Sequence, residues 1–189
     1  MDIKFKPDLL LGKRKLAVTD EKIIWDDKEI CFSQIKRVKF NLTNISIYLI
    51  PIKTVYKFVI EDTSGKLFTI AFAKSIFHKP KDMEQIYSQL EDIFYNKVIL
   101  KEANEIVDQV NEGKKAEIGK YILDKSGLYF TQWGLFKNQE RFIAWENLTY
   151  QTEMGLLRLF AADNKQINTA LSFQNNWETR TLYQILHII

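Results

Sequence analysis

The side chains most often used in catalysis and metal binding are few in this chain and lie far apart. It has two histidines, His78 and His187, and a single cysteine, Cys31. A transition-metal site needs several such ligands together, and these three residues do not form a set. The sequence also lacks a Gly-x-Ser-x-Gly turn, a glycine-rich phosphate loop and a His-Glu-x-x-His motif. We therefore predict that the protein is not an enzyme and that it uses no metal and no cofactor.

Two pairs of neighbouring carboxylates, Asp26-Asp27 and Glu61-Asp62, come closest to an acid/base arrangement. Adjacent residues of a strand point to opposite faces of a sheet, so neither pair makes a good catalytic dyad. Aspartate side chains bond nearby backbone groups in turns. We expect these carboxylates to stabilise turns.

Positive charge is concentrated in the first part of the chain. Residues 1–81 contain 16 Lys and Arg against 9 Asp and Glu, whereas residues 82–189 contain 11 against 15. Such a surface can steer an anionic partner, although it can equally be a solvated face that keeps the protein soluble. Nothing in the spacing of aromatic residues points to base stacking, so nucleic acid is not favoured as a partner. The candidates for contact with anionic lipid headgroups are Lys13, Arg14, Lys15, Lys36, Arg37 and Lys39.

The stretch 45–56 is too apolar for an ordinary solvent-facing edge. One interpretation is a strand buried in a core. The other is an exposed patch for a partner or for self-association, with homo-oligomers as one outcome. Pro51 would limit the addition of a further strand at such an edge. The candidate patch residues are Tyr48, Leu49, Ile50, Ile52 and Tyr56.

The same short plan occurs twice along the chain. Residues 16–38 contain an apolar strand, an Asp-containing turn, a second strand and the step Phe32-Ser-Gln-Ile35. Residues 121–150 repeat this order and contain the matching step Trp145-Glu-Asn-Leu148. Strands follow in each copy, and each copy ends in a helical pattern. The repeat predicts two small domains of similar architecture.

Alternating and β-branched residues predict strands over the rest of each copy. In the first copy they are expected at 14–19, 22–26, 29–32, 36–41, 45–50, 54–61 and 67–73. In the second they are expected at 118–124, 127–133, 139–144, 147–152, 156–162 and 167–173. The clearest hairpin signal is the Ser-Gly turn near Gly65.

A helix is predicted from about Asp82 to residue 112, and Gly113 is a natural stop. Its apolar positions change face near Val98, from a stripe that includes Leu90 to one that includes Val107. A continuous helix with two partners would produce this change. Two helices with a break near Asn96 would explain the pattern nearly as well.

Strands followed by a closing helix, twice over, resemble a tandem of bacterial pleckstrin-homology-like (PH-like) domains. The second half carries the closer likeness, in the order Asp124–Phe130, Ile143–Leu148 and Gly155–Phe160 before the last helix. The resemblance implies, for each half, a bent, partly closed β-barrel of seven strands blocked at one end by a helix. It also implies binding of proteins, peptides or lipid headgroups. Phosphoinositide-binding members carry a basic-x-Arg pair on the second strand, but here that strand leads into Asp26 and Asp27, so this specificity is not carried over.

We therefore expect a mainly β, α+β protein with capping helices. Residues 1–97 would form the first PH-like domain with its C-terminal helix, 98–115 a linker helix, and 116–189 a second, shorter PH-like domain. The expected function is a non-enzymatic binding or scaffolding module for an unidentified protein or peptide. The alternative is a peripheral module that contacts an anionic membrane surface through its basic first domain. With one cysteine and no apolar run of about 18 residues, the expected location is the cytoplasm.

Overall fold

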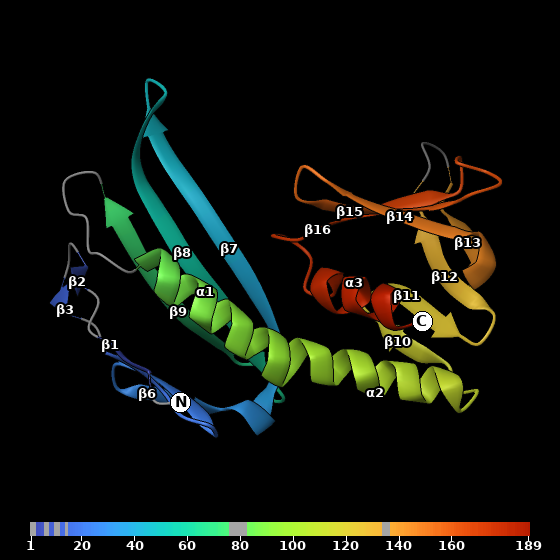
Figure 1. Ribbon diagram of the computed structural model, residues 1–189. Coiled ribbons are helices and arrows are strands. Elements are labelled where there is room, and N and C mark those ends of the chain that lie inside the picture. Colours follow the sequence, from blue (N-terminus) through green and yellow to red (C-terminus); the bar gives the residue numbers. More distant parts are fainter. Residues whose placement is uncertain (1–2, 6–7, 10–11, 14, 76–82, 134–136) are drawn as a thin grey trace. The chain divides into compact units, whose positions relative to one another are not determined.

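The computed structural model describes residues 3–5, 8–9, 12–13, 15–75, 83–133 and 137–189. The chain divides into two compact units, Met1–Val98 and Ile99–Ile189 (Figure 1). Both are mostly antiparallel β-sheet with helices, as the mainly β, α+β class predicted. None of the sheets in the described part of the chain closes on itself.

Unit 1 contains two main sheets and one helix. The first sheet has the order β1-β4-β5-β6 and consists of β1 (Ile3–Phe5), β4 (Leu16–Val18), β5 (Lys22–Trp25) and β6 (Lys28–Cys31). The second has the order β7-β8-β9 and consists of β7 (Ile35–Ile47), β8 (Ile50–Asp62) and β9 (Leu67–Ser75). The remaining elements are the short pair β2 (Asp8–Leu9) and β3 (Gly12–Lys13), the 3-10 turn η1 (Phe32–Gln34) and α1 (Met83–Phe94).

Aromatic rings join α1 to the second sheet. Phe94 is fully buried, and its ring centroid lies 5.3 Å from that of Phe58 and 6.0 Å from that of Phe40. One helical face supplies the contact, because Met83, Ile86 and Leu90 are buried with Phe94. These four residues belong to the stripe predicted from the sequence.

Unit 2 repeats the same element order. Its first sheet, β10-β11-β12-β13, consists of β10 (Ala116–Ile118), β11 (Tyr121–Asp124), β12 (Gly127–Gln132) and β13 (Gln139–Ala144). The 3-10 turn η3 (Trp145–Asn147) follows. The second sheet, β14-β15-β16, consists of β14 (Leu148–Glu153), β15 (Leu156–Ala161) and β16 (Asn168–Ser172), and α3 (Thr179–Ile188) ends the unit.

The steps Phe32-Ser-Gln-Ile35 and Trp145-Glu-Asn-Leu148 adopt the same backbone conformation. Before η1, Cys31 has φ −77° and ψ 142°, and before η3, Ala144 has φ −63° and ψ 146°. After the turns, Ile35 and Leu148 return to extended conformations with ψ 120° and 124°. Each step is therefore the corner at which the chain leaves the four-stranded sheet and begins the three-stranded one.

Helical structure runs without interruption from Met83 to Asn111. A π turn, η2 (Tyr95–Ile99), connects α1 to α2 (Leu100–Asn111), so the chain does not break near Asn96. A π turn has more residues per turn than an α-helix, so it shifts the phase of the apolar stripe. The segment 98–115, expected as a linker, contains α2, whose buried side chains belong to the core of unit 2: Ala103, Ile106, Val107 and Val110.

Two strand predictions are wrong. The single strand expected at 118–124 is divided by a turn at Gly119 and Lys120 into β10 and β11, which pair with each other. The ranges 36–41 and 45–50 were expected as separate strands, but β7 continues from Ile35 to Ile47 and turns directly into β8. Pro51 does not interrupt the sheet, because it is the second residue of β8 and lies beside a register shift at Ile45/Ser46. Proline is tolerated at strand starts and at bulges.

The tight approach of β12 to β13 provides a test of the fold of unit 2. A Cβ on Gly127 would overlap the backbone oxygen of Ile143, whereas a Cβ on Gly155 would meet nothing within 4 Å. We expect Gly127→Ala to lower the free energy of unfolding of unit 2 by about 3 kcal/mol, because the backbone must shift. Gly155→Ala, at φ +75°, is the control and should cost only about 1–2 kcal/mol. Urea unfolding followed by NMR signals of unit 2 measures both, and equal losses would contradict this account.

Candidate functional site

The most exposed apolar residues described in the structure lie at the end of the β7–β8 hairpin. We call residues 45–52 the hairpin tip. The side chains of Tyr48 and Leu49 are 95% and 97% exposed, and that of Ile50 is 61% exposed. The stretch 45–56 was expected to be either a buried strand or an exposed patch. At the hairpin tip it is exposed.

The backbone at the tip is unfavourable for the residues that occupy it. Tyr48 has φ 47° and Leu49 has φ 67°. Tight hairpins with two positive φ angles favour Asn-Gly, because a bulky side chain in the left-handed region costs about 1–2 kcal/mol. Two large apolar residues thus occupy strained positions while making little contact with their own unit.

The strands that carry the tip contain no carboxylate near it in the sequence. Between Val38 and Ile60 the charged residues are all lysines: Lys39, Lys53 and Lys57. Lys53 pairs in register with Ile45, next to the bulge. Across the hairpin, the Thr54 hydroxyl donates a hydrogen bond to Asn44 Oδ1 at 2.9 Å. The tip is therefore an apolar end on a polar and basic stem.

The other two patch candidates are less accessible. Ile52 is half-buried, and Tyr56 is only 2% exposed. The Tyr56 ring stacks on Phe72 with a centroid distance of 5.3 Å and lies 5.2 Å from the ring of Tyr87. Tyr56 is therefore a core residue. The reason is strand alternation, since Phe58 and Ile60 are buried on the same face of β8.

The described basic candidates are distributed over the two sheets of unit 1. Lys36 and Arg37 both reach the carboxylate of Glu61, at 3.7 Å and 2.7 Å. Lys15 is exposed just before β4 in the other sheet, and Lys39 is half-buried on β7. Arg14 and the side chain of Lys13 lie outside the described residues. Glu61 thus offsets part of the charge on which anion binding was predicted.

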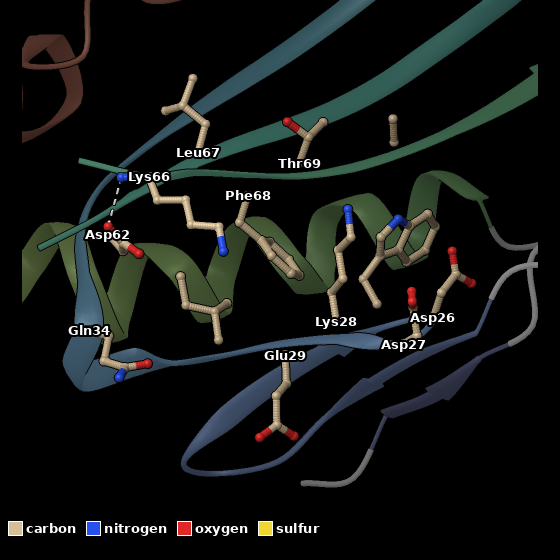
Figure 2. A pocket seen from close by; sticks show the side chains of 13 residues that line it. Asp26, Asp27, Lys28, Glu29, Gln34, Asp62, Lys66, Leu67, Phe68 and Thr69 are labelled. Carbon is tan, nitrogen blue, oxygen red and sulfur yellow. Dashed lines mark hydrogen bonds between the residues drawn. The ribbon is translucent and has the colours of Figure 1, made fainter. Parts of the chain in front are cut away.

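A second feature of unit 1 is a hollow of about 730 Å³ between the last strands of its two sheets, β6 and β9 (Figure 2). We call it the β6–β9 slot. Figure 2 shows Lys66 and Phe68 extending from the β9 side and Lys28 from the β6 side. Local sequence patterns do not predict this slot, because it depends on which strands end each sheet. The lining residues are Trp25, Asp26, Asp27, Lys28, Glu29, Ile30, Gln34, Asp62, Lys66, Leu67, Phe68, Thr69 and Ala71.

Two of the slot carboxylates stabilise turns, as predicted. Asp26 Oδ1 accepts a hydrogen bond from the Lys15 N–H at 2.9 Å. Asp62 Oδ1 accepts a hydrogen bond from the Ser64 hydroxyl at 2.6 Å. It also accepts one from the Lys66 N–H at 2.8 Å (Figure 2). The hydrogen bond from Ser64 is the main cause that lowers the pKa of Asp62. A carboxylate held ionised in this way is a poor proton donor at neutral pH.

Two other side chains that could take part in chemistry are described, one in each unit. His187 is exposed near the end of α3, with Nδ1 2.8 Å from the Tyr183 carbonyl oxygen. Cys31 is a half-buried free thiol, and His78 lies outside the described residues. Across the ranges that the structure describes, no cluster of three or more His, Cys, Asp and Glu residues is placed to hold a metal ion.

Comparison with known proteins adds no relative. No protein-family model matches the chain, and no curated protein or solved structure is significantly similar to it. The helices in the described part of the chain lack the length and apolar character needed to cross a bilayer.

Tyr121 is the most deeply buried titratable group of unit 2, and it gives a prediction for alkaline pH. Its side chain is inaccessible, and its hydroxyl lies 3.0 Å from that of Thr169. Burial raises the pKa of Tyr121 well above its usual value of about 10. Above that pH, the unfolded chain loses this proton while the folded unit keeps it, so the free energy of unfolding falls as pH rises.

We expect this loss to approach 1.4 kcal/mol per pH unit above about pH 10. At pH 8, Tyr121→Phe should lower the free energy of unfolding by about 1 kcal/mol, because the substitution removes the hydrogen bond to Thr169. The variant should also lack the fall in the free energy of unfolding above about pH 10. Urea unfolding of the wild type and of Tyr121→Phe between about pH 8 and 11 measures the difference in their free energies of unfolding. The titration of lysines affects both proteins equally and cancels in this difference. Parallel stability curves would show that Tyr121 ionises freely in the folded unit.

Proposed function

We propose that this protein is a non-enzymatic, cytoplasmic binding module with two PH-like domains, and that it docks on a partner protein through the hairpin tip of unit 1. The observation that carries the proposal is the near-complete exposure of Tyr48 and Leu49 at positive φ. The site on the partner that receives Tyr48 and Leu49 would be an apolar pocket wide enough for a two-residue turn.

The PH-like part of the proposal is supported by element order. In each unit, a four-stranded antiparallel sheet is followed by a 3-10 turn, a three-stranded antiparallel sheet and a helix. The resemblance implies seven strands and a closing helix, which is the number in unit 2, whereas unit 1 has the additional short pair β2–β3. Domains of this kind mostly bind other molecules, although the fold by itself does not identify a ligand.

The docking part is supported by the energetics of the tip. An Asn-Gly turn at positions 48 and 49 would remove strain and expose less apolar surface. Strained positions that persist against such an alternative are concentrated at functional sites. Burial of one large apolar side chain in a partner contributes about 2 kcal/mol, so Tyr48 and Leu49 together can offset the strain that they impose.

Contact with anionic lipid is the second candidate, and one observation favours it. The stem of the hairpin carries Lys39, Lys53 and Lys57 and no carboxylate between Val38 and Ile60. Exposed apolar tips beside lysines also suit a membrane interface. One observation counts against lipid contact. Lys36 and Arg37 both form ion pairs with Glu61, which reduces the positive charge of the surface predicted to bind anionic lipid.

Photo-crosslinking in the native host separates the two candidates. We expect benzoylphenylalanine at position 48 to give a discrete protein adduct. The same probe at position 154, another exposed residue at positive φ in a hairpin of unit 2, should not give this adduct. The additional change Leu49→Asp should abolish it. Absence of a protein adduct, together with Leu49-dependent sedimentation on anionic vesicles, would replace protein docking with lipid binding.

Replacement of the turn tests whether strain is retained for binding. We expect the double variant Tyr48→Asn, Leu49→Gly to raise the free energy of unfolding of unit 1 by about 1–2 kcal/mol, because Asn and Gly tolerate positive φ. The same variant should compete poorly with the wild type for the crosslinked partner. Urea unfolding and a competition crosslinking assay measure the two effects. A less stable variant would show that the tip residues support the fold of unit 1.

A further inference from the structure

A second binding site in unit 1 follows from the β6–β9 slot. We propose that the β9 side of this slot binds an extended, basic peptide segment of a partner, which adds to β9 as a further antiparallel or parallel strand. This site is separate from the hairpin tip and does not depend on the function proposed for it.

The β9 edge is long, regular and apolar. Among the described strands, β9 ends its sheet, and it pairs with β8 from Lys53↔Ser75 to Glu61↔Leu67 without a register shift. Its sequence has no proline, and its only charged residue is Lys74. A long, regular and apolar edge of this kind is a ready template for another strand.

The opposite edge of the same sheet has the features that prevent such pairing. β7 contains two register shifts, between Ile35 and Arg37 and between Ile45 and Ser46. It also carries three basic residues in its first half: Lys36, Arg37 and Lys39. Bulges and charges are the usual protection of an edge strand. The protected edge is therefore β7, and β9 is the edge left available.

The β6–β9 slot provides space beside β9. The slot of about 730 Å³ lies next to residues 67–71, the first half of the strand. Its apolar lining includes Trp25 and Ile30, which are buried, and Phe68, which is partly exposed and extends into the slot in Figure 2. An added strand places alternate side chains on each face of the sheet, so one set would enter the slot while the backbone pairs with β9.

Charge indicates which peptide fits. Four carboxylates line the slot, from Asp26, Asp27, Glu29 and Asp62, against two lysines, Lys28 and Lys66. The salt bridge from Lys22 to Glu29, at 2.7 Å, offsets one of the carboxylates, and Asp26 accepts a hydrogen bond from the Lys15 N–H. The attraction for a basic residue therefore depends mainly on Asp27. Asp26 and Asp27 lie together in the β5–β6 turn, so a lysine or arginine of the peptide would be placed beside that turn.

The probe is a capped peptide of about six residues that alternates valine and lysine, the length of an average strand. NMR titration of the full chain should give saturable binding. Amide hydrogen exchange should slow in residues 67–71, and the indole N–H signal of Trp25 should shift. The same peptide with alternate backbone nitrogens methylated cannot form the strand pairing and should not bind. Equal binding of the methylated peptide, or no effect on these amides, would overturn the proposal.

A charge variant tests whether the basic residues of the peptide lie beside the β5–β6 turn. Asp27→Lys should weaken binding of the valine–lysine peptide about tenfold, because attraction becomes repulsion. The matched control is Glu21→Lys, an exposed change of the same charge at the other end of β5. If both variants weaken binding equally, the attraction comes from net charge and the proposed site is wrong. A free chain that is already dimeric through β9, detected by sedimentation and slow exchange of residues 67–71 without peptide, would also overturn it.

Discussion

The ring of Phe94 is the contact on which unit 1 depends. It lies against Phe40 of β7 and Phe58 of β8, and its centroid is 6.4 Å from that of Phe32 in the corner turn η1. One side chain of α1 therefore contacts both the three-stranded sheet and the corner that begins it. Aromatic pairs in edge-to-face and tilted geometries add to the free energy gained by burial.

This contact also explains why the far part of the β7–β8 hairpin can be exposed. The buried residues of the hairpin end at Phe40 on β7 and begin at Tyr56 on β8, where α1 supplies Tyr87 and Phe94. Beyond these residues, no described side chain of the hairpin is fully buried, and the strands continue through main-chain pairing and the hydrogen bond from Thr54 to Asn44. The hairpin is packed against α1 at one end and exposed to solvent at the other, which suits a projecting contact surface.

Much of the fold could be predicted from local sequence. The steps at Phe32 and Trp145 mark equivalent corners, and the repeated order of strands follows from alternation and turn residues that act over a few positions. Burial of Tyr56 was also encoded, because it shares the alternation of Phe58 and Ile60. The hairpin turn was missed, since Tyr48-Leu49 is not the residue pair that such a turn favours and Pro51 resembles a strand break.

The candidate sites were less predictable for a different reason. Exposure of the tip depends on where α1 and β9 end relative to β7 and β8, and the slot depends on which strands lie at the ends of the two sheets. Both are properties of long-range pairing, which alternation along one strand does not determine. The carboxylates Asp26 and Asp62 were assigned correctly to turns, but their presence at the slot required the two sheets to be placed.

The π turn has a consequence for cooperativity. Val98 belongs to unit 1 and Ile99 to unit 2, and both side chains are buried. A helix that ended between them would leave its terminal backbone groups without helical partners. Loss of either unit would therefore leave backbone groups at the helical end of the other unit without helical partners.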